Sequence, residues 1–224
     1  MEIMPNVHLI PDIIANPYLI IDPDGLTLID TGLPGSHKKI LGYLRERGFS
    51  ASDLKRIVLT HSDMDHVGSL AALKQASGAE TFASAIEAAA IAKGIPSRRI
   101  RPARFGRRLF MAVLGRFFRP APIQVDHILA EGQSLPVLGG LQVLETPGHT
   151  PGHISLFSPS TGILFVGDSI VSRDTGLVGS VPANTWDLAR AAESVRKQAA
   201  LGARVVCSGH GPVVMDAVGK MPSA

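Results

Sequence analysis

The chain has 224 residues, of which 45% are hydrophobic, and a formal net charge of +3. This length and apolar fraction predict a globular protein with a substantial core and exclude a disordered chain. No apolar run reaches the roughly 18 residues of a membrane-spanning helix, and residues 1–5 lack the basic and apolar regions of a secretion signal. The lone Cys207 cannot form an internal disulfide, and it agrees with a cytoplasmic protein.

Short β-rich segments alternate with helical patterns in the first half, which predicts an α/β layered fold. Ser36 is expected to cap a helix that ends near Arg47, and Ser84 with Glu87 forms a capping-box pattern for a helix that ends at Gly94. A further helix is expected from Val67 to Ala76. The expected strands are Val7–Ile10, Tyr18–Asp22, Leu26–Asp30, Arg56–Thr60 and Ala79–Ala83.

The second half repeats this pattern. One helix is expected from Trp186 to Ala200, with Leu188, Ala192, Val195 and Ala199 on its buried stripe. Leu28-Ile29-Asp30-Thr31-Gly32 is weakly echoed by Phe165-Val166-Gly167-Asp168-Ser169, so two similar halves are expected to bring their strand ends to one edge. The expected strands are Leu141–Glu145, Ile154–Ser158, Ile163–Val166 and Arg204–Cys207.

A dense polar cluster, His61-Ser62-Asp63-Met64-Asp65-His66, directly follows the expected strand Arg56–Thr60. Grouping these side chains costs desolvation and like-charge repulsion unless cations are present. In an extended segment His61, Asp63 and Asp65 would share one side, with His66 at the following bend. The cluster therefore predicts a site for one or two metal ions, whereas a solvated turn that caps a helix is the simpler alternative.

Three more polar residues stand among glycines where expected strands end. His149 lies in Gly148-His149-Thr150-Pro151-Gly152-His153, Asp168 follows Gly167, and His210 lies between Gly209 and Gly211. Glycine and proline permit tight turns and a close approach of the backbone to a ligand. Each residue alone would be ordinary, but their shared setting favours a common site.

In their order along the chain, these motifs resemble the metallo-β-lactamase superfamily. The resemblance covers nearly the whole chain and implies a four-layer αβ/βα sandwich, here a single domain of residues 1–224, with a dinuclear metal site at one edge of its sheets. It implies a first metal site of His61, Asp63 and His149, and a second of Asp65, His66 and His210, bridged by Asp168. It also implies that Asp30 supports the ligands and that His153 is structural.

One residue departs from the usual family motif, His-x-His-x-Asp-His, because Asp63 stands where the second histidine is expected. A carboxylate is a harder ligand, so iron or manganese become credible besides zinc, which is still our first expectation for the two divalent ions. A related iron-binding branch also has a carboxylate at this position. Alternatively, Asp63 stays off the metal and holds a water molecule.

A basic segment interrupts the chain before the His149 motif. Residues 97–122 contain eight arginines among apolar residues, and no acidic residue occurs between Glu87 and Asp126. One interpretation is a lid whose basic rim attracts an anionic substrate. A second is contact with a membrane or a nucleic acid, and a third is packing on the domain or on a second copy in a homodimer.

The predicted function is a metal-dependent hydrolase. A metal-bound hydroxide would attack an ester, lactone, thioester or related carbonyl of a small molecule, with Asp65 and Asp168 as the catalytic carboxylates. No Gly-x-Ser-x-Gly, Walker or Gly-x-Gly-x-x-Gly motif points to other chemistry. Two alternatives are an iron-dependent oxidoreductase of the same fold and a non-catalytic binding module that uses the Arg-rich segment; a nucleic acid or a membrane is not the expected partner.

Overall fold

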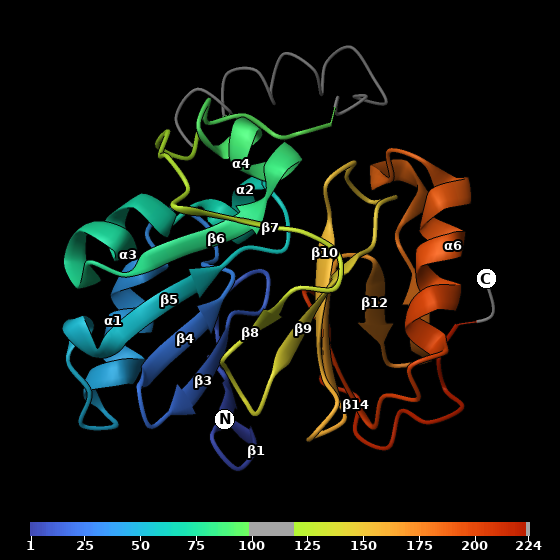
Figure 1. Cartoon of the computed structure of the whole chain (residues 1–224), viewed down its shortest axis with the longest axis horizontal. Helices are drawn as coiled ribbons and strands as arrows, with labels where there is room; N and C mark the ends of the chain where they lie inside the picture. Colours follow the sequence, from blue (N-terminus) through green and yellow to red (C-terminus); the bar gives the residue numbers. More distant parts are fainter. Residues whose placement is uncertain (99–118, 223–224) are drawn as a thin grey trace.

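A computed structural model describes residues 1–98 and 119–222. Two mixed β-sheets face each other, and helices cover their outer faces (Figure 1). The predicted α/β layered fold is therefore confirmed. Of the Arg-rich segment 97–122, residues 99–118 lie outside the described residues, so the three interpretations of that segment stay predictions.

The first sheet contains seven strands in chain order, and its pairing changes from antiparallel to parallel at β4. The turn at Asp22–Gly25 closes the β3–β4 hairpin, in which Asp22 pairs with Gly25. The strands are β1 (Glu2–Met4), β2 (Val7–Leu9), β3 (Tyr18–Asp22), β4 (Gly25–Ile29), β5 (Leu54–Val58), β6 (Glu80–Ser84) and β7 (His127–Leu129).

The second sheet has the order β14-β11-β10-β9-β8, and its β11–β14 pair is parallel. This pair is the counterpart of the parallel β4–β5 pair, so the echo noticed in the sequence corresponds to a similar arrangement in the two halves. Its strands are β8 (Ser134–Leu135), β9 (Leu141–Glu145), β10 (Ile154–Ser158), β11 (Ile163–Gly167) and β14 (Val205–Ser208), and a separate hairpin is formed by β12 (Ile170–Arg173) and β13 (Gly176–Gly179).

Within residues 1–98 and 119–222, four helices cover the first sheet or its edge, and one covers the second (Figure 1). Two predictions were wrong here. The single helix expected from Val67 to Ala76 is two helices, and Ser36 stands before α1 without a side-chain capping bond, because it already has helical backbone angles. The helices are α1 (His37–Arg45), α2 (Met64–Val67), α3 (Leu70–Ser77), α4 (Ala85–Ile91) and α6 (Leu188–Ala199), with short 3₁₀ turns η1 (Ala51–Asp53) and η2 (Pro182–Asn184).

Alternating side chains of the strands divide the core into layers. On β3, Tyr18 and Ile20 pack between the two sheets, whereas Leu19 packs with α1 and α3 on the outer face. Cys207 of β14 is fully buried in the layer between the sheets, and burial raises the pKa of its thiol well above the usual value. Both sheets are therefore buried on two faces, and the strand ends hold the polar side chains.

The buried stripe predicted for α6 is one position off. Leu188 is 56% exposed, and the inward residues include Ser194 and Gln198. These polar side chains are buried because they are hydrogen bonded. The Ser194 hydroxyl donates to the backbone carbonyl of Pro147. The side-chain amide oxygen of Gln198 accepts from the hydroxyls of Ser155 and Ser169. No helix in residues 1–98 and 119–222 is long and apolar enough to cross a membrane.

Candidate metal centre

The predicted site residues meet at the edge where the parallel strands of both sheets end. Asp30 and His61 follow β4 and β5, and Asp168 and His210 follow β11 and β14. His149 lies in the loop between β9 and β10. Carboxyl ends of parallel strands are a common place for ligand sites in α/β proteins. The sequence expectation that the two halves contribute to one edge therefore agrees with the structure.

The first triad consists of His61, Asp63 and His149, whose ligand-type atoms all lie within 4.8 Å of one another. The Nε2 atoms of His149 and His61 lie 3.2 and 3.7 Å from Asp63 Oδ2. The chain is extended only as far as Asp63, because α2 begins at Met64, so the expected extended run does not continue to Asp65. Burial raises the pKa of Asp63, but contacts with His149 and His61 and the charge of Arg98 hold that pKa well below the usual value.

The second triad consists of Asp65, His66 and His210, again within 4.8 Å. Asp65 and His66 lie on α2, and His210 Nε2 lies 3.3 Å from Asp65 Oδ2. Hydrogen bonds to Asp168 and Asp65 raise the pKa of His210 to about 9 despite its burial. The acidic surroundings therefore favour a cation at this position.

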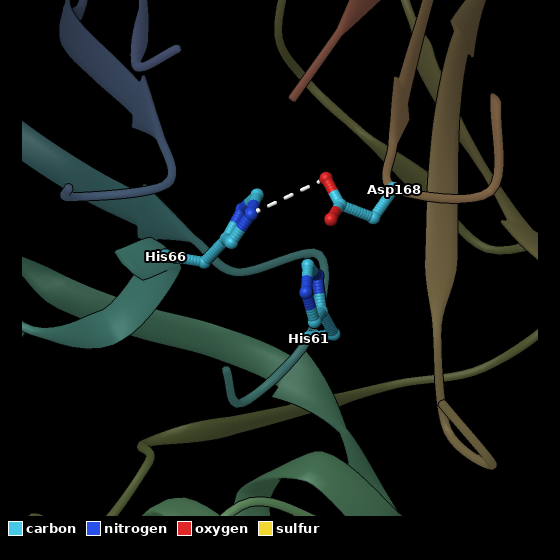
Figure 2. A group of neighbouring side chains, drawn as sticks. All are labelled: His61, His66 and Asp168. Atoms are coloured by element: carbon cyan, nitrogen blue, oxygen red, sulfur yellow. Dashed lines mark ion pairs between the residues drawn. The ribbon is translucent and has the colours of Figure 1, made fainter. Parts of the chain in front are cut away.

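Asp168 forms a further group of possible ligands with one histidine of each triad, His61 and His66 (Figure 2). Its Oδ1 atom lies 3.3 Å from His66 Nε2, and its Oδ2 atom lies 3.4 Å from His210 Nε2 and 3.6 Å from His149 Nε2. Burial raises its pKa, but His66 and His210 hold the pKa well below the usual value. One carboxylate thus reaches histidines of both triads, as the predicted bridging role requires.

Hydrogen bonds fix the tautomers of His61 and His66 through one carboxylate. Thr60 Oγ1 donates to Asp30 Oδ2 at 2.8 Å, so it accepts the Nδ1 proton of His61 at 2.9 Å. His66 Nδ1 lies 2.8 Å from the same Asp30 oxygen and donates to it. In both rings Nε2 is therefore the atom that faces the cluster, and Asp30 acts as the predicted support.

A second chain of hydrogen bonds orients His149. Thr185 Oγ1 donates to the Val181 carbonyl, so it accepts from Ser180 Oγ, which in turn accepts the Nδ1 proton of His149 at 3.0 Å. His149 Nε2 is thereby left to face the cluster. Ser180 and Thr185 were not predicted as site residues, because no motif surrounds them in the sequence.

Glu87 is another support that sequence reasoning missed. Its fully buried carboxylate accepts from the backbone N–H groups of Ser62 and Gly152 and from the Thr150 and Ser97 hydroxyls. It therefore joins the loop after β5 to the His149 loop. The capping-box pattern indicated only that Glu87 lies in the first turn of a helix, where the Ser84 hydroxyl accepts from its N–H.

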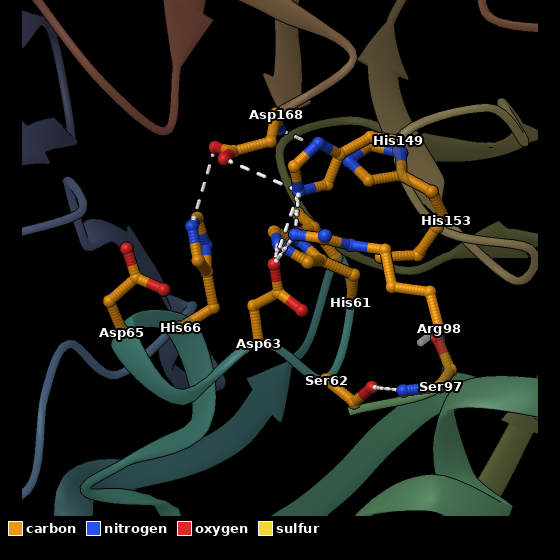
Figure 3. A network of polar contacts seen from close by, with 12 residues as sticks. His61, Ser62, Asp63, Asp65, His66, Ser97, Arg98, His149, His153 and Asp168 are labelled. Atoms are coloured by element: carbon orange, nitrogen blue, oxygen red, sulfur yellow. Dashed lines mark hydrogen bonds and ion pairs between the residues drawn. The ribbon is translucent and has the colours of Figure 1, made fainter. Parts of the chain in front are cut away.

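His153 lies against the cluster without sharing its role (Figure 3). Its Nδ1 atom lies 2.8 Å from Thr146 Oγ1, and its Nε2 accepts the Asp168 N–H at 3.1 Å. Full burial and the nearby His61 and His149 hold the pKa of His153 well below the usual value. The neutral ring positions the Asp168 backbone, in agreement with the structural role expected for it.

The donor atoms fit divalent metal ions. Among the described residues, four buried side-chain atoms of the cluster have no hydrogen-bond partner: His61 Nε2, His66 Nε2, Asp63 Oδ1 and Asp168 Oδ1. Such atoms are costly to bury unless they bind something. Imidazole nitrogens and carboxylate oxygens are ligands for zinc, iron and manganese. The two triads therefore have the atoms, spacing and orientation of a two-metal centre.

A cavity of about 330 Å³ opens beside the triads. Its volume lies at the small end of the range that small-molecule sites occupy. Val171 and Val181 supply an apolar wall, whereas the remaining lining is polar. The polar lining residues are Asp63, Asp65, Arg98, His149, Asp168, Ser180, Asn184 and His210.

The sequence matches known proteins over nearly its full length. The profile described as the metallo-beta-lactamase superfamily matches residues 10–210. The chain is 30% identical to the probable metallo-hydrolase YflN of Bacillus subtilis, over 94% of this chain and 85% of that protein. It is also 32% identical to a hydroxyacylglutathione hydrolase of Cereibacter sphaeroides, over 76% of this chain but only 52% of that enzyme.

Solved structures share the fold. A metallo-beta-lactamase family protein of Thermus thermophilus superimposes with a TM-score of 0.77 at 27% identity, over 98% of this chain and 78% of that one. The protein TTHA1623, solved in a di-iron-bound form, superimposes with a TM-score of 0.69 at 27% identity, over 93% of each chain.

Proposed function

The chain belongs to the metallo-beta-lactamase superfamily, and on this premise we propose that it is a metal-dependent hydrolase of small esters, lactones or thioesters. The observation that carries the proposal is the convergence of the two triads on Asp168 beside the cavity. Its relatives support the reaction class, because one is called a probable metallo-hydrolase and several are called hydroxyacylglutathione hydrolase.

In this proposal the two triads and Asp168 hold two divalent ions, with zinc as the first expectation. When bound, such ions polarise a carbonyl oxygen and make water a better nucleophile. We assign the ligand roles to His61, Asp63 and His149 for one ion and to Asp65, His66 and His210 for the other. Asp168 contacts histidines of both sets.

The protein's own groups provide the proton transfers. Asp65 is the most solvent-accessible of the three carboxylates, with 30% of its side chain exposed against 13% for Asp63 and 12% for Asp168. It can therefore accept a proton from the attacking water. The water oxygen adds to the carbonyl carbon, the bond to the leaving oxygen or sulfur breaks, and Asp65 passes the proton taken from the water to the leaving group. Ser180 is not available as a nucleophile, because His149 and Thr185 hold its hydroxyl.

The test uses the full chain, stripped of metal and reloaded with zinc, iron or manganese. We expect hydrolysis of at least one member of a panel that contains an aryl ester, a γ-lactone and a hydroxyacyl thioester. Asp168→Ala should lose both bound metal and hydrolysis, whereas Asp174→Ala, at an exposed turn, should keep both. Full retention of metal and activity by Asp168→Ala would refute the assignment.

A second candidate, an iron-dependent oxidoreductase, is favoured by one observation. The cluster contains three carboxylates, those of Asp63, Asp65 and Asp168. Carboxylate oxygens are hard ligands, and they make iron a more credible metal here than a set of soft thiolate ligands would. The di-iron form of TTHA1623 belongs to a protein of the same fold. Metal analysis of protein purified without added metal separates the candidates, since two irons with oxygen uptake would contradict the hydrolase.

A further inference from the structure

Arg98 places a positive charge inside the first triad (Figure 3). Its Nη2 atom forms an ion pair with Asp63 Oδ2 and lies 3.3 Å from His149 Nε2. Only 7% of the Arg98 side chain is exposed. This arginine is therefore not part of a solvated rim, but a buried cation in contact with two of the three predicted ligands of the first ion.

The contacts of Arg98 use the same acceptor atoms that a metal would use. Asp63 Oδ2 and His149 Nε2 lie 3.2 Å apart, and the orientation of His149 by Ser180 directs the Nε2 lone pair toward Asp63. Two acceptors at this distance repel each other unless a proton or a cation lies at both. The guanidinium, which is always charged, fulfils that role in this structure.

The preceding residue anchors Arg98 from both its backbone and its side chain. The Ser97 N–H donates to Ser62 Oγ at 2.9 Å, and the Ser97 hydroxyl donates to Glu87 Oε1 at 2.8 Å. Ser62 lies between His61 and Asp63 in the loop that follows β5. Arg98 is thus fixed to the loop whose carboxylate it pairs with.

We infer that Arg98 is a built-in cation that competes with a metal ion for the first triad, so that this triad binds its ion more weakly than the second triad does. The inference rests on the proposed metal function. A metal ion at His61, Asp63 and His149 must displace the guanidinium from Asp63, and the displaced charge must find another partner. Asp65, His66 and His210 have no such competitor among the described residues, and they are expected to fill first.

The test is titration of the metal-free full chain with Zn²⁺, and separately with Co²⁺, by calorimetry and visible absorption. Wild-type protein should bind one ion tightly and a second weakly. Arg98→Met keeps the apolar stem and removes the charge, and it should bind the second ion at least about tenfold more tightly, with the first ion unchanged. Arg98→Gln serves as a second variant if Arg98→Met does not fold.

Two further variants make the result specific. Arg190→Met removes an arginine from an exposed pair with Asp187 and should leave both affinities unchanged. The double variant Arg98→Met/Asp63→Asn should lose the increased affinity for the second ion. This loss would assign the more tightly bound second ion to the first triad. Equal affinities for the second ion in wild type and Arg98→Met, or weaker binding in Arg98→Met, would overturn the competition but leave the metal function intact. Failure of every variant and the wild type to bind metal would overturn both.

Discussion

A single carboxylate, Asp30, determines the protonation of two imidazoles that face the metal centre. It accepts from the Thr60 N–H and hydroxyl and from His66 Nδ1, and the Thr60 hydroxyl accepts from His61 Nδ1. Asp30 itself has a left-handed backbone with φ of 59°, just past the end of β4. The proton positions at the centre thus depend on a residue that touches neither of the ligand-facing nitrogens.

We predict that Asp30→Asn weakens metal binding while the fold is kept. The Thr60 N–H fixes the amide oxygen at Oδ1, so the amide nitrogen replaces Oδ2 and donates to Thr60 Oγ1 and His66 Nδ1. Both rings then carry their proton on Nε2, and metal affinity should fall about 10- to 100-fold. Metal titration measures the loss, and nitrogen NMR of the imidazoles reports the tautomers. Asp22→Asn, which alters a carboxylate that accepts from Leu138 N–H, is the matched control; equal loss there would contradict the explanation.

We predict that Gly209→Ala disturbs the centre by steric contact alone. A Cβ atom at this position would overlap Asp168 Oδ1 and lie 2.8 Å from His66 Cε1. Misplacing such groups by about 1 Å is expected to lower hydrolysis by roughly 100-fold. Gly42→Ala adds the same methyl group to α1, where nothing lies within 4 Å, and should leave activity unchanged. Metal content and kcat/KM check both variants. Wild-type values for Gly209→Ala would contradict the prediction, because they would show that the backbone shifts to accommodate the added methyl group.

The candidate metal ligands could be predicted from the sequence, whereas several residues that hold these ligands in place could not. His61, Asp65 and His149 stand in local motifs beside strand ends. Thr185 and Glu87 support the centre only because distant segments fold against it. The residues next to them in the sequence form no motif that would predict these contacts. The contact of Arg98 with Asp63 was missed for the same reason, since the sequence showed only an Arg-rich segment.

Among the elements, those with a strong local pattern were predicted well. Strands β3, β9 and β10 begin and end where the β-rich segments of the sequence indicated. The buried stripe of helix α6 was predicted one position off, because tertiary hydrogen bonds bury Ser194 and Gln198 while Leu188 is exposed. Hydrophobic periodicity cannot reveal a polar residue whose partner lies on another element.

Asp126, directly before β7, connects strand β6 with helix α3. Its Oδ2 atom accepts from the Thr81 N–H and hydroxyl of β6 at 2.8 and 2.7 Å, and it forms an ion pair with Lys74 of α3. Although burial raises its pKa, Lys74 and Thr81 lower it to about 2. Because this pKa is depressed in the folded state, the carboxylate contributes stability above the unfolded pKa and loses it as the pH falls.

We predict that Asp126→Asn lowers the free energy of unfolding by about 1 kcal/mol at neutral pH. The difference from wild type should shrink as the pH falls from the ordinary value of 3.8 to about 2, where about half of the Asp126 carboxyls are protonated in the folded protein too. Urea unfolding at a series of pH values measures it. Glu193→Gln on the exposed side of α6 should show no such difference. A gap between Asp126→Asn and wild type that stays constant down to pH about 2 would contradict the ion-pair explanation.

At the scale of the whole molecule, the centre joins the two halves of the fold. The first half contributes the loop after β5 and helix α2, and the second half contributes the loops after β9, β11 and β14. Three aspartates close together repel one another across this junction, and in the described residues Arg98 offsets only part of their charge. A cation held by both halves therefore stabilises the folded chain in addition to any chemical role.

We predict that metal binding raises the melting temperature. An ion that binds only the folded chain, at a free concentration of about 1,000 times its Kd, stabilises it by about 4 kcal/mol. For a chain of this size such a gain corresponds to roughly 10 °C. Circular dichroism of metal-loaded and chelator-treated protein measures the shift, and Asp168→Ala should abolish it, because that variant loses the carboxylate between the triads. A shift of equal size in Asp168→Ala would place the stabilising ion elsewhere, because this variant lacks the carboxylate that contacts His66, His149 and His210.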